Sequence, residues 1–123
     1  MEIMKYLLSR GLAPEIAEYL TSEEANKSEF IPFAVNREDY AIHHFLDGSH
    51  RSGYGVKKTN DQLKTDETDY VAVALVEGDD VICINVQDGS VHLWLIQSGD
   101  GEMIKVTDSF SDFLSISTEQ LAV

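Results

Sequence analysis

The first residues of the chain carry apolar side chains at helical spacing, in two short runs. Within residues 2–10 these side chains recur as one face of a helix requires: Ile3, Met4, Leu7 and Leu8. Gly11 interrupts the run, and Pro14 suits the first turn of a second helix that reaches residue 20. The pattern predicts two short amphipathic helices at the start of the chain.

From residue 30 onward the pattern changes from helix to strand. Pro32 has no N–H to give to a sheet, which places its segment at a sheet edge or at a strand start. The nearly unbroken apolar run at residues 70–77 is expected in the sheet interior. Short turns with Gly beside Asp join the last four segments and predict an antiparallel meander. The six strand-like segments are residues 30–35, 40–46, 70–77, 80–87, 90–97 and 102–108.

A long polar connection separates the second and third of these segments. Residues 47–69 contain few apolar side chains, and the pattern allows only a short strand at residues 54–58. Polar connections of this length in a compact domain are either mobile or functional. We therefore expect binding residues in this segment.

The chain ends in a further helix-like segment. Ser109 can cap a helix that carries Phe110, Phe113 and Leu114 on one face, and that face is expected to pack on the sheet. Together the elements predict one α+β domain over residues 1–123. It has N-terminal helices, an antiparallel meander sheet and a C-terminal helix packed on the sheet.

The chain is strongly acidic. Its 22 Asp and Glu residues outnumber 9 Lys and Arg residues, which gives a formal net charge of −13. A field of this sign repels phosphate backbones and disfavours nucleic-acid binding, whereas it attracts basic proteins and speeds encounter with them. Because acidity also serves solubility, the charge favours a basic partner without identifying one.

The cellular compartment is predicted from the N-terminal sequence, the length of the apolar runs and the number of cysteines. The chain has no apolar run near the roughly 20 residues that span a bilayer. Its N-terminus lacks the basic start and cleavage site of a secretory signal, and its single Cys83 cannot form an internal disulfide. We expect a cytoplasmic protein that does not bind membranes.

Candidate chemistry is sparse. His43 and His44 are adjacent on a predicted strand, where neighbouring side chains point to opposite faces, so we do not expect them to share a metal ion. A metal site would need His50 or His92 as well, with oriented supporting groups. Cys83 lies in an apolar strand, where burial makes a thiol inert. We therefore predict no catalytic residues, no metal and no cofactor.

The segment from residue 78 to residue 114 resembles the SUKH superfamily, the Smi/Knr-type proteins. A Gly-Asp turn, an apolar strand with a cysteine, a second strand ending in an aromatic residue and a Ser-Phe helix follow one another. Residues 30–34 are similar to the Leu-Pro-Phe-type strand of that family, and residues 11–20 to its N-terminal helix. The matching residues are Gly78, Asp79, Ile82, Cys83, Ile84, Gly89, Val91, Trp94, Ser109, Phe110, Phe113 and Leu114.

The resemblance implies a protein-binding function without catalysis. Bacterial members of the superfamily are immunity proteins that bind and block a cognate toxin domain, frequently a nuclease, and fungal relatives are regulatory interaction proteins. A nuclease needs a basic surface to hold phosphates, and an acidic protein can occupy that surface. The resemblance therefore points to an immunity protein, or antitoxin, with a basic toxin domain as its partner.

Acidic and aromatic residues of the polar connection and of the turns are the candidate contacts. The acids would steer the encounter, and an aromatic anchor would hold the complex. Two other functions stay open: a regulator that binds a small ligand on the concave side of the sheet, and a small metal-dependent enzyme built on the histidines. The candidate partner-binding residues are Tyr54, Asp61, Asp66, Glu67, Asp69, Asp79, Asp80, Asp100 and Glu102.

Overall fold

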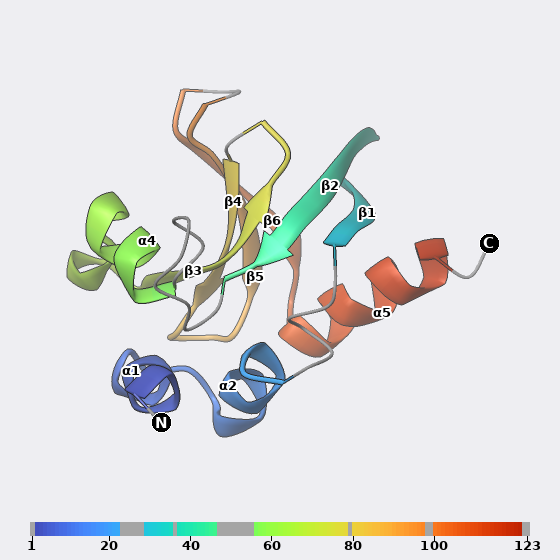
Figure 1. Ribbon diagram of the computed structural model, residues 1–123. Coiled ribbons are helices and arrows are strands. Elements are labelled where there is room, and N and C mark those ends of the chain that lie inside the picture. The colour runs from blue at the N-terminus through green and yellow to red at the C-terminus, as the bar shows by residue number, and fades with distance from the viewer. Residues whose placement is uncertain are drawn as a thin grey trace.

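A computed structural model of the protein describes residues 2–22, 29–35, 37–46, 56–78, 80–97 and 100–121 (Figure 1). The helices are α1 (Glu2–Ser9), α2 (Pro14–Leu20), α4 (Val56–Leu63) and α5 (Phe110–Leu121), with a 3-10 helix, η1, at Thr65–Glu67. The strands are β1 (Glu29–Val35), β2 (Glu38–Phe45), β3 (Tyr70–Val76), β4 (Asp80–Asn85), β5 (Val91–Leu95) and β6 (Glu102–Thr107).

The strands form one six-stranded antiparallel sheet in the order β1-β2-β3-β4-β5-β6. The predicted meander is confirmed and extends to the first two strands. Pro32 lies in the edge strand β1, and the apolar run of β3 lies inside the sheet, as expected. The predicted α+β class, with helices before the sheet and one helix after it, is confirmed.

The polar connection contains a helix where the sequence pattern allowed a strand. Residues 56–58 begin α4, so the strand at residues 54–58 was wrong over its described part. The side chain of Asn60 explains why α4 is held against β3. Its amide Nδ2 donates to the carbonyl of Ala72 at 2.9 Å, and its Oδ1 accepts the N–H of Ala72 at 2.8 Å. The Asn60 amide thus makes the hydrogen bonds that a neighbouring strand would make.

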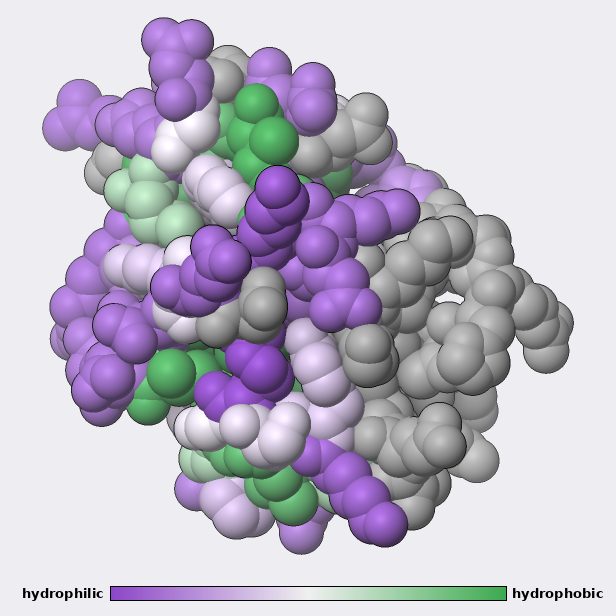
Figure 2. Space-filling view, turned by 90° about the vertical axis from the view of Figure 1, so that its left-hand side faces the viewer, coloured by the Kyte–Doolittle hydropathy of each residue, from purple (hydrophilic) through white to green (hydrophobic). Residues whose placement is uncertain are grey.

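The helices lie around the sheet on different sides. In Figure 1, α4 lies to the left of the sheet and α5 to the right, with α1 and α2 below. Helix α5 contacts both edge strands, β1 and β6. Figure 2 shows the side of the molecule away from α5, where hydrophilic side chains surround smaller apolar areas.

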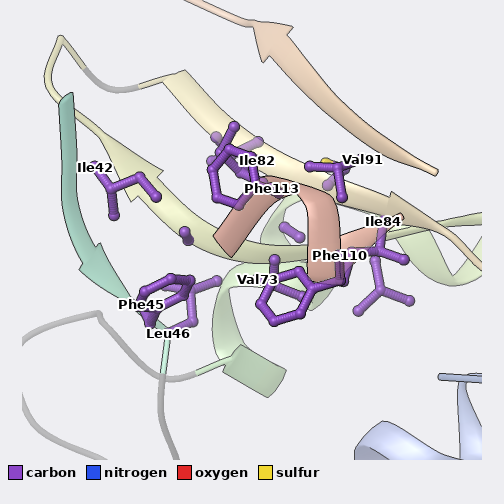
Figure 3. Close-up of a cluster of buried hydrophobic side chains, with 14 of the residues drawn as sticks. Ile42, Phe45, Leu46, Val73, Ile82, Ile84, Val91, Phe110 and Phe113 are labelled. Atoms are coloured by element: carbon purple, nitrogen blue, oxygen red, sulfur yellow. The ribbon is translucent and has the colours of Figure 1, made fainter. Parts of the chain in front are cut away.

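The core lies between α5, α2 and one face of the sheet (Figure 3). Phe110 and Phe113 of α5 point onto sheet residues such as Ile82, and both are buried. The predicted Ser109 cap is confirmed, because Ser109 Oγ accepts the N–H of Asp112 at 3.1 Å. Removing a buried Phe side chain costs about 3–5 kcal/mol, so α5 is a main source of stability. Buried residues such as Val81 and Cys83 extend the core to the opposite sheet face, whereas exposed acids lie at the ends of the strands.

Candidate protein-binding surface

Three turns of the meander lie together at one end of the sheet, which we call the hairpin end. In an antiparallel meander every second turn falls at the same end, so the β1–β2, β3–β4 and β5–β6 turns share it. These turns lie at the top of the molecule in Figure 1, and the helices α1 and α2 lie at the other end. Segments far apart in the sequence therefore form one surface.

The hairpin end is acidic. Among the residues described there, five exposed acids oppose one exposed base, Arg37. The acids come from all three turns, and hydrogen bonds between the strands fix the positions of the turns relative to one another. A concentrated field of one sign attracts a partner of the opposite sign and raises its association rate. The five acids are Glu38, Asp39, Glu77, Asp100 and Glu102.

The environment of Tyr40 shows how close the three turns are. Its hydroxyl donates to Glu38 Oε2 at 2.8 Å, and its ring stacks on Phe33 with the ring centroids 5.6 Å apart. The hydrogen bond to Glu38 raises the pKa of Tyr40, with smaller contributions from burial and from the negative charges of Glu38, Asp80 and Glu102. Carboxylates of all three hairpins thus act on one phenol.

Asp80 does not have the exposed position that its turn sequence suggested. Its side chain is 1% exposed, and its Oδ1 accepts the backbone N–H of Gln97 at 2.8 Å. The carboxylate therefore joins the β3–β4 turn to the residues that follow β5. We correct the expectation that Asp80 contacts a partner, because its buried carboxylate is not accessible to a partner and instead bonds to the backbone.

The remaining candidate residues divide between the two ends of the sheet. Asp100 and Glu102 are exposed at the hairpin end. Asp61, Glu67 and Asp69 are exposed at the other end, on α4, η1 and the start of β3, where η1 also contains Asp66. The 7 residues of β3 separate the two groups by about 20 Å, at roughly 3.3 Å a residue. Tyr54 and Asp79 lie outside the described residues.

Sequence reasoning missed Glu38, Asp39 and Glu77. Each looks like an ordinary turn acid, and only strand pairing brings them beside Asp100 and Glu102. The order of the strands could have identified these acids, because the first, third and fifth turns of a meander lie at the same end of the sheet.

The His43–His44 pair differs from the prediction. The register of β2 against β3 shifts between Ile42 and His44, and this bulge brings the two imidazoles onto one side. Their Nδ1 atoms contact each other, and the ring centroids are 4.2 Å apart. The expectation that the two side chains point to opposite faces was therefore wrong. In the described part of the chain, no group of three or more His, Cys, Asp or Glu side chains could hold a metal ion.

A Ser–His contact at the β4–β5 turn does not form a nucleophile–base pair. Ser90 Oγ lies 2.6 Å from Asp88 Oδ1 and 2.8 Å from His92 Nε2. Its hydroxyl donates to the carboxylate, so the imidazole is not the base for that proton, and Ser90 is only 2% exposed. The contact instead stabilises the turn.

The prediction that Cys83 is a buried core residue is confirmed. Its side chain is 0% exposed, and burial raises the pKa of the thiol to about 12. The thiolate that would act as a nucleophile is therefore almost absent near neutral pH.

None of the helices described is long and apolar enough to cross a membrane.

Comparison with protein families gives a match over most of the chain. The family model described as the SMI1 / KNR4 family (SUKH-1) matches residues 3–116, which include every strand of the sheet and most of α5. Comparisons with curated proteins and with solved structures give no match.

Proposed function

The chain belongs to the SMI1/KNR4 family (SUKH-1), and from this premise we propose that it is a non-catalytic, cytoplasmic immunity protein that binds and neutralises a basic toxin domain. A nuclease is the class of toxin expected, because nuclease surfaces are basic where they hold phosphates. The immunity protein would occupy that surface and exclude the substrate.

The acidic hairpin end is the observation that carries this proposal. Its exposed acids come from three turns that strand pairing brings to one end of the sheet, so their negative fields add. Charge complementarity with a basic partner raises the association rate. The exposed acids Asp61, Glu67 and Asp69 at the other end add to long-range attraction, although about 20 Å separates them from the hairpin end along β3.

Affinity capture from the native cell lysate, at low and moderate salt and followed by mass spectrometry, tests the proposal. We expect a basic partner that moderate salt releases, and we expect its purified toxin domain to lose its activity when this protein is added in equimolar amount. Recovery of no basic partner at low salt, or of a partner whose activity persists in the complex, would contradict the proposal.

Charge reversal then distinguishes the two acidic groups. One triple variant carries Glu77→Lys, Asp100→Lys and Glu102→Lys, and a matched variant carries Asp61→Lys, Glu67→Lys and Asp69→Lys. Each changes the net charge by the same amount. At low salt we expect the hairpin-end variant to lower the association rate constant by about tenfold or more, within the range of electrostatic steering. Stopped-flow measurements should show a smaller effect for the matched variant, and the reverse order would move the binding surface to the α4 end.

A further inference from the structure

A row of apolar side chains crosses four neighbouring strands on the sheet face away from α5. Leu75 of β3 pairs with Val81 of β4, Val81 pairs with Trp94 of β5, and Trp94 pairs with Met103 of β6. Side chains of directly paired residues lie on the same face of a sheet. We call these four residues the apolar row.

The apolar row lies on the sheet face away from α5, although Val81 itself belongs to the buried core. Ile82 and Leu93 are the neighbours of Val81 and Trp94, and both point into the core and are 0% exposed. Because successive side chains of a strand alternate between faces, the row points away from α5. Figure 2 views this side, and in its upper part green and pale side chains lie between purple ones.

Three members of the row remain accessible. Leu75, Trp94 and Met103 are half-buried, whereas Val81 between them is only 2% exposed. Leu75 and Trp94 pack partly against the core, which holds them in place. Trp and Met are enriched at protein interfaces, where an aromatic residue on a rigid element can serve as an anchor.

The row ends at the acidic hairpin end. Leu75 lies two residues before Glu77, and Met103 directly follows Glu102. A Cβ placed on Gly101 would be 4.0 Å from Trp94 Nε1, so the β5–β6 turn passes beside the indole. An accessible apolar strip beside fixed negative charges has the anatomy of an interface with a basic protein: an apolar centre and a charged rim.

We propose that the apolar row is the docking surface for the basic partner domain, which inserts an apolar side chain against Trp94 and Met103 while its basic residues meet Glu77, Asp100 and Glu102. This inference rests on the proposed function and adds where the partner binds. The net charge of the chain favours a basic domain over a second copy of this chain as the occupant of the apolar row. A second copy of this chain also carries −13 and would bring the same acids against these, whereas a basic domain complements them.

Fluorescence provides the test, because Trp94 is the single tryptophan of the chain. The probes are two tryptophan-free peptides of 15 residues with equal positive charge. One peptide combines Lys with Leu, and the other replaces each Leu by Ser. We expect the Lys/Leu peptide to shift the Trp94 emission to shorter wavelength and to bind about tenfold more tightly than the Lys/Ser peptide, since an anchor contributes more than about 1 kcal/mol.

Two matched variants locate the site. Met103→Ser removes an apolar side chain of the row, and Leu8→Ser removes an exposed one from α1, where Leu8 is 42% exposed. We expect Met103→Ser to weaken binding of the Lys/Leu peptide about tenfold, as loss of an interface anchor does, and Leu8→Ser to leave it unchanged. Unchanged circular dichroism of both variants would show that the fold is intact.

Other results would overturn the inference. Equal binding by both variants, no binding of the Lys/Leu peptide, or binding without a change in Trp94 emission would each do so. A wild-type dimer in light scattering that Met103→Ser dissociates would assign the row to a second copy of the chain. Affinity capture tests the proposed function independently of the docking surface. If a toxin is captured and binds Met103→Ser as tightly as the wild type, the docking surface is refuted and the proposed function is not.

Discussion

His92 lies half-buried on β5, between the hydroxyl of Ser90 and the ring of Tyr70. The Ser90 Oγ is 2.8 Å from Nε2, and the Tyr70 ring meets the imidazole edge-on with the centroids 5.2 Å apart. Burial lowers the pKa of His92 below its usual value, Lys105 lowers it further, and Asp88 opposes the shift. The folded protein thus favours the neutral imidazole.

This pKa difference predicts a pH dependence of stability. A histidine in an unfolded chain has a pKa near 6.5, so below about pH 7 the unfolded state binds a proton that the folded state resists. The contribution of His92 is therefore complete above the unfolded pKa and decreases as the pH falls toward the folded pKa. We expect wild-type protein to lose more free energy of unfolding between about pH 7.5 and 5.5 than His92→Gln, measured by urea denaturation. Equal losses would show that His92 does not contribute.

Single residues show which structural roles could be predicted from the sequence and which could not. Cys83 was predictable, because its neighbours in the strand are apolar. Asp80 was not, since in so acidic a chain a turn aspartate looks like a solvated charge, and its hydrogen bond joins it to the backbone N–H of Gln97, 17 residues away. His43 and His44 depend on a bulge that arises from pairing with β3. Long-range backbone contacts decide such roles.

Helix α4 is joined to β3 and α1 by one network of polar side chains. Thr65 Oγ1 donates to Asn60 Oδ1 at 2.5 Å, and Arg10 donates to both Thr65 Oγ1 and the carbonyl of Tyr70. Asn60 is 1% exposed and Ala72 is 0% exposed, so water does not replace these hydrogen bonds. Hydrogen bonds of buried polar side chains therefore hold α4 and η1 in place.

Loss of the Asn60 amide should be costly. Asn60→Ala leaves the N–H and C=O of Ala72 without partners, and a buried unpaired group costs about 1–3 kcal/mol. We expect the free energy of unfolding to fall by about 2–4 kcal/mol on this basis, measured by chemical denaturation. Gln62→Ala, an exposed position on the same helix, is the control and should change it by less than about 0.5 kcal/mol. A loss no larger than that of the control would show that α4 is held by other contacts.

This anchoring explains which elements the sequence predicted. Strands β3 to β6 and helix α5 have regular apolar periods and Gly-Asp turns or a serine cap, so local patterns were sufficient. Helix α4 has few apolar residues, and its polar Asn60 forms hydrogen bonds only after β3 is in place. A pattern of apolar positions does not detect an element that side-chain hydrogen bonds hold.

The net charge of −13 acts on the whole molecule. Like charges repel one another in the compact state and move apart on unfolding, so the charge opposes folding. The exposed acids of the hairpin end lie on neighbouring turns and add to this repulsion. Salt screens such interactions over a Debye length of about 10 Å at 0.1 M.

Stability should therefore rise with salt. We expect the free energy of unfolding to increase by up to about 1 kcal/mol between about 0.02 and 0.3 M NaCl, in the range of exposed charge interactions. The triple variant Glu77→Gln, Asp100→Asn, Glu102→Gln should show a smaller increase. Thermal unfolding at several salt concentrations measures both, and a decrease for the wild type would mean that attractive ion pairs dominate.

At this scale the sequence predicted a basic partner, which stays a prediction, and it singled out Asp100 and Glu102, which are exposed at the hairpin end. It did not show which acids form one surface, because Glu38 and Asp39 join them only through the pairing of β1 with β2 and of β2 with β3. The apolar row was hidden for the same reason. Its four residues are spread over four strands, and each taken alone looks like ordinary sheet packing.

The placement of every second turn at one end of the sheet has a consequence for how such a protein can change in evolution. The exposed acids of the hairpin end lie on the turns or directly beside them, whereas the buried core residues lie mainly on the strands and helices. Turn residues tolerate replacement better than core residues, because their side chains make few packing contacts. Under the proposed function, mutations in three short stretches would therefore change the charges that the partner meets while the core residues stay the same. The residues that would select the partner are thus largely different from the residues that form the core.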